Sequence, residues 1–588
     1  MSSRTILLAL VAVAALVPVI PGVPVFWITL LNNIGLASLV AMGLVLLTGV
    51  GGLTSFGQAA FCGFGAYTTA LLTTAYGFSP WVTLPVALLI TGVVALILGL
   101  VTMRLSGHYL PLGTIAWGIS LYFLFGELEI LGKHDGLIAV PPLNIAGYDL
   151  YDSRAIYYVI WTFVLLAGIA THNLLDSRVG RAIRALRGGS VAAESFGVKT
   201  FRVKLIVFIY SALLAAISGW LFAHMQRAVN QTPFGINAGI EYLFMAVLGG
   251  AGHVGGAILG SGLVTILKDQ LQRLLPQLFG SKGNYEMIVF GFLLVVLLQT
   301  AREGLWPWLA SLFPARQQPP RPVAAEPLPR RTMPDAAEPL LSLKSARKSF
   351  GGLLAVNDVS FDVRSREIVG LIGPNGAGKS TIFNLVTGVL WPTGGEVRFK
   401  GERIDSQHAQ AVARRGIART FQHVNVLSNM SVLDNVALGA HLRGSKGSLA
   451  SLARLDRAEE RRLLNEAATQ IERIGLAEQM HRPAGSLSLG QLRIVEIARA
   501  LCLDPVLLLL DEPAAGLRHM EKRELAAMLA KLKSEGMTIL LVEHDMSFVM
   551  GLTDHLVVVD FGTKIAEGKP ADVRANPAVI EAYLGGVA

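Results

Sequence analysis

The sequence is short of cysteine and of charged residues. Only two of its 588 residues are cysteines, and charged residues make up 15% of the chain. Cys62 lies in an apolar run and Cys502 directly before a predicted buried strand, so we expect no disulfide and a reducing cytoplasmic environment. Few charges, 52% hydrophobic residues and a mean hydropathy of +0.53 are together typical of a membrane protein.

What is present divides the chain into parts. Residues 1–300 hold several apolar runs that a water-soluble surface cannot carry, whereas residues 340–588 have the mixed charge and alternating periodicities of a soluble α/β domain. Between them, residues 301–339 contain nine prolines, which prevent a continuous helix, and Arg and Glu that keep the stretch solvated. We therefore predict a multi-domain protein: a helical transmembrane domain at 1–300, a Pro-rich linker at 301–339 and an α/β domain at 340–588.

Apolar runs suited to crossing a bilayer recur in the first domain. A membrane helix needs about 20 mainly apolar residues. A further run, Tyr242 to Leu267, is broken by the glycine-rich stretch 249–256. The first run follows Arg4 but lacks a cleavage site with a polar sequel, so we interpret it as a retained span. We expect about 8–10 spans. The unbroken candidates are 5–21, 27–48, 58–76, 81–102, 110–131, 156–175, 203–223 and 287–300.

Basic residues indicate the orientation of these spans. Seven Lys and Arg residues and one acid, Glu194, lie between Asp176 and Leu205, which is typical of a cytoplasmic loop and explains much of the net charge of +9 without a nucleic-acid partner. Six spans precede this loop, as a cytoplasmic N-terminus requires. If the last domain is also cytoplasmic, the broken run must return to its own side, as a helix pair or re-entrant hairpin. One long kinked helix is the alternative.

A strand, a glycine-rich loop and a helix follow one another early in the α/β domain. Residues 367–373 predict a buried strand and residues 382–389 an apolar helix. The loop between them reads G-x-x-x-x-G-K-[ST], whose backbone amides cradle phosphates while its lysine reaches the β- and γ-phosphates and its hydroxyl binds Mg²⁺. We therefore predict ATP and Mg²⁺ as cofactors. The expected phosphate-loop residues are Gly373, Pro374, Asn375, Gly376, Ala377, Gly378, Lys379, Ser380 and Thr381.

A second buried strand, Val506 to Leu510, ends in two acids. Its five apolar residues are too few for a span and fit a central parallel strand. At its carboxyl end Asp511 is suited to hold Mg²⁺, with Ser380, and Glu512 to polarise an attacking water. Three weaker features accompany it: Ser488, Gly490 and Gln491 at a helix start, Gln422 after a strand, and His544 after another strand.

In this order these features resemble the ABC ATPase family over residues 340–588. The resemblance implies that Gln422 is the Q-loop residue, which touches Mg²⁺ or water and links the nucleotide to the permease. It makes Glu512 the catalytic base and His544 the switch histidine. It also implies that Ser488, Gly490 and Gln491 of the signature bind the ATP of a second, head-to-tail cassette. Phe350 stands where the family stacks an aromatic on adenine, and we expect it to do so here; a core phenylalanine is the alternative.

Two residues depart from the family pattern. Leu489 stands where the signature has a glycine, and Arg518 stands where the loop after the catalytic strand often has Asp or Asn. We expect the first change to be tolerated. The second puts communication between the paired sites in doubt.

The first domain resembles the permeases of branched-chain amino acid (LIV-type) importers. The similar stretches are 52–67, 104–109 and 240–250, and in the ATPase 511–517 and 580–585 point the same way. The resemblance makes residues 177–197 the cytoplasmic coupling loop. Its small residues Ala192, Ala193 and Gly197 allow a short helix to seat beside the Q-loop, with Phe196 as an anchor. A solvated positive loop is the alternative.

Two functions of different class remain open at this point. The first is ATP-driven import of branched-chain or similar small amino acids across the bacterial cytoplasmic membrane, with urea, amides or aromatic acids as other cargoes. It implies a periplasmic binding protein and a second permease and ATPase half, either identical or distinct. The second is an exporter half-transporter, which needs no binding protein; short spans and the coupling loop favour import. Polar residues that are candidates for the substrate path are Asn32, Asn33, Gln58, Glu127 and Glu129.

Replacing the expected base tests the catalytic assignment. Glu512→Gln keeps the shape and hydrogen bonding of the side chain but removes its ability to accept a proton, so ATP binding should persist while turnover is abolished. Nucleotide binding and phosphate release by the purified protein measure the two effects. Retained hydrolysis would assign the base to another residue.

Overall fold

The computed structural model describes residues 15–105, 107, 109–279, 285–300, 304–312, 321–322, 324–334 and 339–584. The chain divides into two compact units, which we call the helical unit and the α/β unit. The loop 177–200 groups with the α/β unit, although it lies inside the first expected domain. The helical unit comprises 1–176, 201–317 and 451–454, and the α/β unit comprises 177–200, 318–450 and 455–588.

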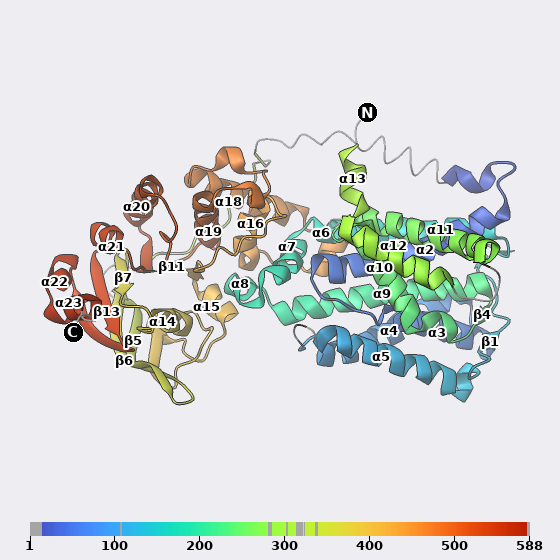
Figure 1. Cartoon of the computed structure of the whole chain (residues 1–588), viewed down its shortest axis with the longest axis horizontal. Coiled ribbons are helices and arrows are strands. Elements are labelled where there is room, and N and C mark those ends of the chain that lie inside the picture. Colours follow the sequence, from blue (N-terminus) through green and yellow to red (C-terminus); the bar gives the residue numbers. More distant parts are fainter. Residues whose placement is uncertain are drawn as a thin grey trace. The chain divides into compact units, whose positions relative to one another are not determined.

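Long apolar helices dominate the helical unit and run side by side (Figure 1). Short strand pairs, β1 with β4 and β2 with β3, tie the loops at one end. The helices are α2 Val25–Leu44, α3 Gln58–Thr74, α4 Pro80–Thr102, α5 Tyr109–Glu127, α6 Ser153–Leu175, α9 Thr200–Gln226, α10 Ile236–Gly250, α11 Val254–Phe279, α12 Tyr285–Thr300 and α13 Leu305–Ser311. The short elements are η1 Val17–Val19, the π-helix η2 Val45–Val50, η3 Glu129–Leu131, η5 Thr232–Phe234, β1 Leu137–Ile138, β2 Asn144–Ile145, β3 Tyr148–Asp149 and β4 Ala228–Val229.

Five helices in the described part of the chain are long and apolar enough to cross a membrane: α2 with η2, α4, α5, α6 and α9. They coincide with five of the expected spans. The expected span 58–76 is the 17-residue helix α3 and 287–300 is α12, both below that length, while most of 5–21 lies outside the described residues. The total of about 8–10 spans therefore stays a prediction.

The broken run forms a helical hairpin. Helix α10 ends at Gly250 and α11 begins at Val254, so the glycine-rich stretch contains the turn. The two helices pack with almost no space between them: a Cβ on Gly249 would lie 1.8 Å from the Gly256 carbonyl oxygen, and one on Gly260 1.8 Å from that of Met245. This antiparallel pairing confirms the helix pair and makes the single kinked helix wrong.

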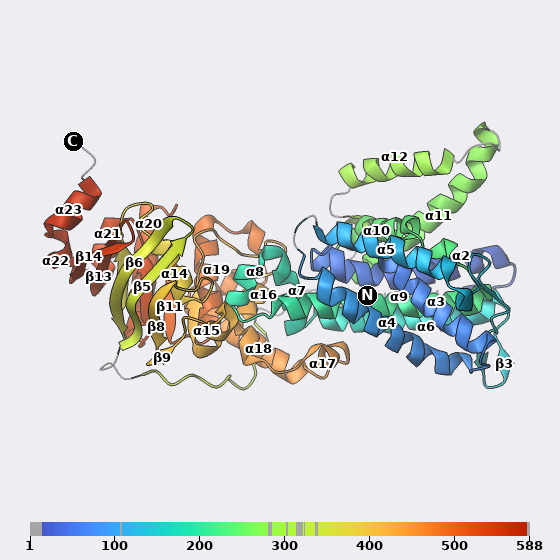
Figure 2. The same ribbon diagram turned by 90° about the horizontal axis from the view of Figure 1, so that it is seen from below.

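The α/β unit is built on a six-stranded sheet with the order β10-β11-β12-β7-β13-β14, parallel except for the final strand. A second, antiparallel sheet has the order β6-β5-β8-β9, and Figure 2 shows its strands lying close together as one layer. The strands are β5 Pro339–Phe350, β6 Leu353–Arg364, β7 Ile368–Ile372, β8 Gly394–Phe399, β9 Glu402–Arg403, β10 Ile417–Arg419, β11 Leu507–Asp511, β12 Thr538–Val542, β13 His555–Asp560 and β14 Thr563–Gly568.

Helices surround these sheets. Every residue of β7, β11 and β12 is buried, as expected of parallel strands covered on both faces. The helices are α7 Arg178–Ala185, α8 Ser190–Ser195, α14 Lys379–Val386, α15 Ala409–Arg415, α16 Val432–Gly439, α17 Ser448–Leu452, α18 Arg457–Arg473, α19 Leu489–Cys502, α20 His519–Ser534, α21 Met546–Leu552, α22 Pro570–Arg574 and α23 Pro577–Leu584. The short 3₁₀ turns are η4 Leu186–Gly188, η6 Ala440–Arg443, η7 Ala477–Gln479 and η8 Ala484–Ser486.

The linker is less solvated than its composition predicts. Leu328 is only 5% exposed and joins a core cluster with residues of α16, α18 and α19. The Arg330 guanidinium lies 2.9 Å from the Glu466 carboxylate, and the backbone amide of Arg331 donates to Asp504 at 2.6 Å. The Arg330 side chain is 50% exposed although it pairs with Glu466, so the arginines of the described linker reach solvent as expected, while Leu328 fastens the stretch to the α/β unit.

Glycines let α3 and α9 touch through their backbones. A Cβ on Gly219 would lie 1.9 Å from the Cys62 carbonyl oxygen, and one on Gly65 would lie 2.1 Å from that of Ala216. Without an aqueous phase to drive association, such close approach supplies the packing energy between membrane helices.

We expect Gly219→Ala to destabilise the helical unit, since a methyl group there must push apart two backbones at a cost of about 1–3 kcal/mol. Gly291→Ala in α12 is the matched control, because a Cβ at Gly291 meets nothing within 4 Å. Melting of the detergent-solubilised chain and its monodisperse yield measure the effect. Equal behaviour of the two variants would contradict the packing argument.

Candidate functional site

The phosphate loop joins the end of β7 to the start of α14. Gly376 and Gly378 have φ of +83° and +95°, and a Cβ on Gly378 would lie 2.5 Å from the Ala355 carbonyl oxygen, so this turn requires glycine. The Lys379 ammonium donates to the carbonyls of Gly373 and Pro374 at 2.8 Å each, and burial lowers the pKa of Lys379. Asn375, Gly376 and Ser380 are exposed, so amides and a hydroxyl are accessible to a phosphate chain.

The buried aspartate at the end of β11 has one occupied and one free oxygen. Arg419, on the neighbouring strand β10, donates to Asp511 Oδ2 at 2.9 Å, and both side chains are almost fully buried. Burial raises the pKa of Asp511, and the Arg419 guanidinium opposes that rise. Asp511 Oδ1 is buried and has no hydrogen-bond partner among the described residues. A free carboxylate oxygen and an exposed serine hydroxyl are oxygen ligands of the kind that Mg²⁺ prefers.

Three side chains predicted from separate motifs meet beside it. The Gln422 amide donates to Glu512 Oε2 at 3.1 Å, and His544 Nδ1 lies 4.0 Å from the same oxygen. Glu512 has φ of +47°, a left-handed conformation that is strained for a residue other than glycine and is common at functional sites. His544 is exposed and Glu512 partly buried, so both can reach a ligand from solvent. The arrangement provides a carboxylate, Glu512, that can act as a general base, with the Gln422 amide and the His544 imidazole next to it.

The signature residues form the start of α19. Ser488 Oγ accepts from the Gln491 amide and the Gln491 side chain accepts from the Ser488 amide, a reciprocal cap of the helix. These hydrogen bonds stay within the first turn. Leu489 is 48% exposed, so its side chain does not disturb the fold of the turn. Phe350 is 44% exposed under the Lys348 ammonium, which makes a core role wrong and leaves adenine stacking as a prediction.

The loop 177–200 packs on the α/β unit, with most of its residues buried and the stretch around 187–191 largely exposed. Arg181 makes a bidentate ion pair with Glu460 of α18, in which both side chains are at most 5% exposed. Arg178 donates to the carbonyls of His441 and Lys446 at 2.7 and 2.6 Å. Burial and the two arginines lower the pKa of His441 to about 3, so it is uncharged beside them at neutral pH.

Helix α8 and the residues after it pack close to the Q-loop segment, residues 421–425, as the sequence predicts. Helix α8 lies against α15 (Figures 1 and 2). Phe196 is 1% exposed and its ring lies under the Arg499 guanidinium of α19, with 4.6 Å between Arg499 Cζ and the ring centroid. A Cβ on Gly188 would lie 3.1 Å from Leu427. The prediction that Phe196 anchors this loop is confirmed, and a solvated loop is excluded.

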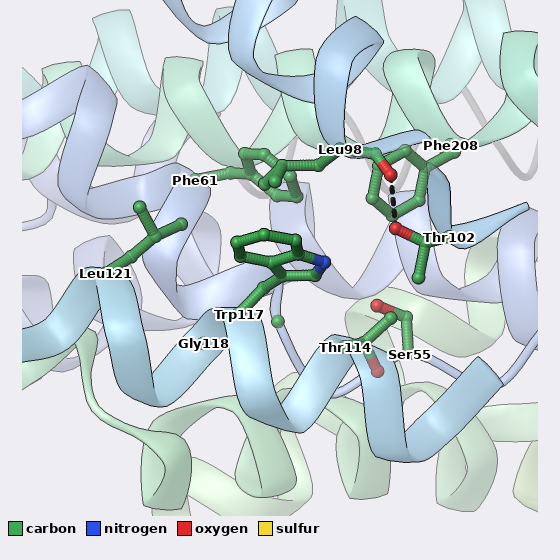
Figure 3. Close-up of a pocket in the computed structure, with 10 residues that line it drawn as sticks. Ser55, Phe61, Leu98, Thr102, Thr114, Trp117, Gly118, Leu121 and Phe208 are labelled. Carbon is green, nitrogen blue, oxygen red and sulfur yellow. Dashed lines mark hydrogen bonds between the residues drawn. The ribbon is translucent and has the colours of Figure 1, made fainter. Parts of the chain in front are cut away.

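The helical unit holds a pocket between α3, α4, α5 and α9. Figure 3 shows the Trp117 indole among Phe61, Leu98 and Phe208, with hydroxyls of Thr102, Thr114 and Ser55 on one side. None of the five polar residues predicted for a substrate path lines it. Asn32 instead donates to the Ser153 carbonyl at 2.8 Å, a link between α2 and α6, and Glu129 pairs with Lys133 on the surface.

Sequence reasoning missed several residues around the catalytic site. Arg419 lies close to the Q-loop glutamine in the sequence, but a single arginine at the end of a strand gives no indication of which acid it pairs with. Glu543 is 0% exposed and accepts from the Ala514 amide at 2.6 Å, which fixes the loop after β11. Arg493, Glu496 and Arg499 have the spacing of one helix face, which could have pointed to a shared role.

A phosphate loop, a buried acid pair, a Q-loop glutamine, a capped signature helix and a helical membrane unit define an ABC-type ATPase joined to a transport permease. Residues 6–298 match the family "Branched-chain amino acid transport system / permease component". Residues 356–515 match the ABC transporter family, and residues 563–588 match the "Branched-chain amino acid ATP-binding cassette transporter" family. The chain belongs to the branched-chain amino acid ABC transporter family, with permease and ATPase in one polypeptide.

Curated relatives cover the ATPase part. The chain is 46% identical over 252 residues to the high-affinity branched-chain amino acid transport ATP-binding protein LivG of Salmonella typhimurium, covering 42% of this chain and 99% of the relative. Identity is 44% to BraF of Pseudomonas aeruginosa and 34% to a probable LivG of Methanocaldococcus jannaschii, over 99% and 97% of those proteins.

Solved structures similar to this part include ATP-binding cassettes of ABC transporters. One is nucleotide-free, with 33% identity and a TM-score of 0.38, and covers 42% of this chain and 99% of its own. Another is in its ADP conformation, with 33% identity and a TM-score of 0.39, and covers 42% of this chain and 100% of its own.

The buried Arg181–Glu460 pair should be costly to break on one side. Arg181→Met leaves the Glu460 carboxylate buried without its partner, which costs about 3–5 kcal/mol in pairs of this kind, whereas the double variant Arg181→Met/Glu460→Met should recover most of the loss. Melting of the full-length protein measures both. If the double variant is as unstable as Arg181→Met, the loss of stability does not come from an unpaired buried Glu460 carboxylate, and the prediction is wrong.

Proposed function

We propose that this protein imports branched-chain amino acids across the bacterial cytoplasmic membrane as one half of an ABC importer. A soluble periplasmic protein delivers the substrate, and ATP hydrolysis in the α/β unit drives its passage. The membership of the branched-chain amino acid transport family supports the cargo. The observation that carries the proposal is the burial of the permease-derived loop 177–200 among α16, α18 and α19 beside the Q-loop segment.

The geometry of this loop favours import over export. Helix α6 ends at Leu175, α7 begins at Arg178 and α9 begins at Thr200, so the link between two spans is a compact pair of short helices. An exporter permease instead projects long helices into the cytoplasm. The compact loop, in which Arg181 and Phe196 are buried, therefore supports the importer.

Each residue of the ATP site has a role in this proposal. Asp511 and Ser380 would hold Mg²⁺, with Gln422 as a further ligand, and the ion would supply positive charge that neutralises the phosphates. Lys379 exchanges its bonds to loop carbonyls for phosphate oxygens. Glu512 accepts the proton of the attacking water, and His544 senses the γ-phosphate from the neighbouring strand.

The site requires a second ATPase half. ABC cassettes form dimers, and the bonds of Ser488 and Gln491 within their own helix turn leave the exposed end of α19 free to cap ATP held by a partner. The partner is a second copy of this chain or a distinct permease with its own ATPase. Arg518 is exposed on the loop after β11, so it faces the partner cassette with a cation where the family often has an acid or amide.

ATPase activity in proteoliposomes tests the import proposal. With candidate binding proteins and leucine, isoleucine or valine, we expect stimulation above the rate seen with unloaded binding protein. Binding proteins loaded with urea or an aromatic acid provide the cargo control. Activity indifferent to every binding protein would support the exporter instead, and stimulation only by urea would reassign the cargo.

A further inference from the structure

One face of α19 holds the Q-loop segment 421–425 by its main chain. Arg499 donates to the Asn425 carbonyl at 2.9 Å, and Glu496 accepts from the Asn425 amide at 2.9 Å. Two turns earlier, Arg493 donates to the carbonyls of Phe421 and Gln422 at 2.9 and 2.6 Å. Main-chain polar groups at both ends of the segment are therefore tied to one helix.

The three side chains on this face form a buried charged group. Arg499 donates to Glu496 at 3.2 Å, and Arg493 lies 3.8 Å from the same carboxylate. Exposed fractions are 8% for Arg493 and 1% for both Glu496 and Arg499. Burial lowers the pKa of Arg499 and raises the pKa of Glu496, and their mutual attraction opposes both shifts. Arg493 Nε, Glu496 Oε2 and Arg499 Nε have no hydrogen-bond partner among the described residues, so the position of the group depends on the few bonds that it does make.

The same arginine contacts the permease-derived loop. The Phe196 ring covers the Arg499 guanidinium, and both are among the largest fully buried side chains in the protein. The next residue, Gly197, has φ of +83° and a Cβ there would lie 2.1 Å from Leu442, so the backbone that carries the ring is closely packed. A shift of this backbone is therefore expected to move the ring against the Arg499 guanidinium.

The far end of the segment contacts the catalytic base. Gln422, whose carbonyl is held by Arg493, donates from its side chain to Glu512 at 3.1 Å. Contacts therefore run from Phe196 through Arg499 and Glu496 to Asn425, and from Arg493 through Gln422 to Glu512. An ion pair of 3.8 Å between Glu496 and Arg493 joins the two series.

We propose that Arg499 is a positioning residue through which Phe196 of the permease-derived loop sets the place of the segment 421–425, and with it the hydrogen bond between Gln422 and Glu512. Displacement of the loop moves the Arg499 guanidinium, loosens Asn425 and shifts the Gln422 amide relative to the base. The rate of ATP hydrolysis then depends on the position of the permease-derived loop. The inference rests on the proposed function only in taking the loop 177–200 as the element that moves with the permease.

The test uses the full-length chain in nanodiscs without any amino acid. Phe196→Leu keeps apolar volume but removes the ring, and Phe196→Tyr keeps the ring. Hydrogen–deuterium exchange, resolved to single amides, reports on Asn425, whose amide is held by Glu496. We expect Phe196→Leu to speed exchange there by roughly thirtyfold, the equivalent of one lost desolvated cation–π contact, and Phe196→Tyr to restore protection.

A matched control and a double variant separate positioning from general loosening. Phe361→Leu makes the same change at a 4% exposed site in β6 outside this network, and should leave Asn425 unchanged. Arg499→Lys should reproduce the effect of Phe196→Leu, and combining the two should add nothing. In the complex that hydrolyses ATP, Phe196→Leu should lower kcat several-fold with the KM for ATP unchanged.

Unchanged exchange at Asn425 in Phe196→Leu, faster exchange throughout the α/β unit, or full addition of the two variants would overturn the proposal. None of these measurements involves cargo or binding protein. A failed import assay therefore does not contradict the role proposed for Arg499. Failure of the exchange experiment likewise does not contradict the import proposal.

Discussion

The catalytic centre depends on the direction and order of the strands in one sheet. Strands β10, β11, β12 and β7 are adjacent and parallel, so their carboxyl ends open at one edge. The residues that follow them come from four distant parts of the sequence: Gln422, Glu512, His544 and the phosphate loop. A register shift of one residue in β11 would turn Asp511 away from Arg419 and toward the opposite face of the sheet. Apolar packing of the strands therefore fixes the chemistry at their ends.

That edge concentrates negative charge, and the fold balances it with specific donors. Asp511 has Arg419, Glu543 accepts the amides of Ala514 and His544, and Glu512 has the Gln422 amide. The balance leaves Asp511 Oδ1 free among the described residues. A carboxylate buried with only one oxygen satisfied is costly unless something else binds the other, which explains why this position suits a cation.

Motifs made the ATP site largely predictable because each carries its chemistry within a few adjacent residues. The strand before Gly373 and the acids after Leu510 could be read directly, and the structure brings Gln422, Glu512 and His544 together as their motifs indicated. The helical hairpin was one of two readings of the glycine-rich stretch. Contacts between distant charged residues could not be read, since neither Arg181 nor Glu460 carries any sign of the other in its own neighbourhood.

The permease was less predictable for a related reason. Apolar runs gave the helices and their approximate ends, but a hydroxyl in a membrane helix usually bonds to its own backbone, as Thr102 does to Leu98. Such residues give no sign of which pocket they face. The polar residues that seemed informative, such as Asn32, proved to join helices. Helix packing in a membrane is decided by where small residues lie, so Gly65 and Gly219 were better guides than any polar side chain.

Because permease and ATPase are joined in one chain, the contacts of the loop 177–200 need not bring two separate molecules together. In relatives such as LivG, of which the matched region covers 99%, the ATPase is a separate protein. There, any corresponding contact must overcome the entropy of bringing two molecules together. In this chain the linker makes that encounter intramolecular, so the contacts form at an effective concentration that does not depend on the amount of protein. A buried ion pair such as Arg181–Glu460 adds little net affinity, yet it strongly disfavours any register in which one partner is unpaired. The linker therefore keeps the two domains together, while the Arg181–Glu460 pair and Phe196 determine the single position in which the loop binds. In that position Phe196 contacts Arg499, which we propose positions the Q-loop segment and, through Gln422, the base Glu512.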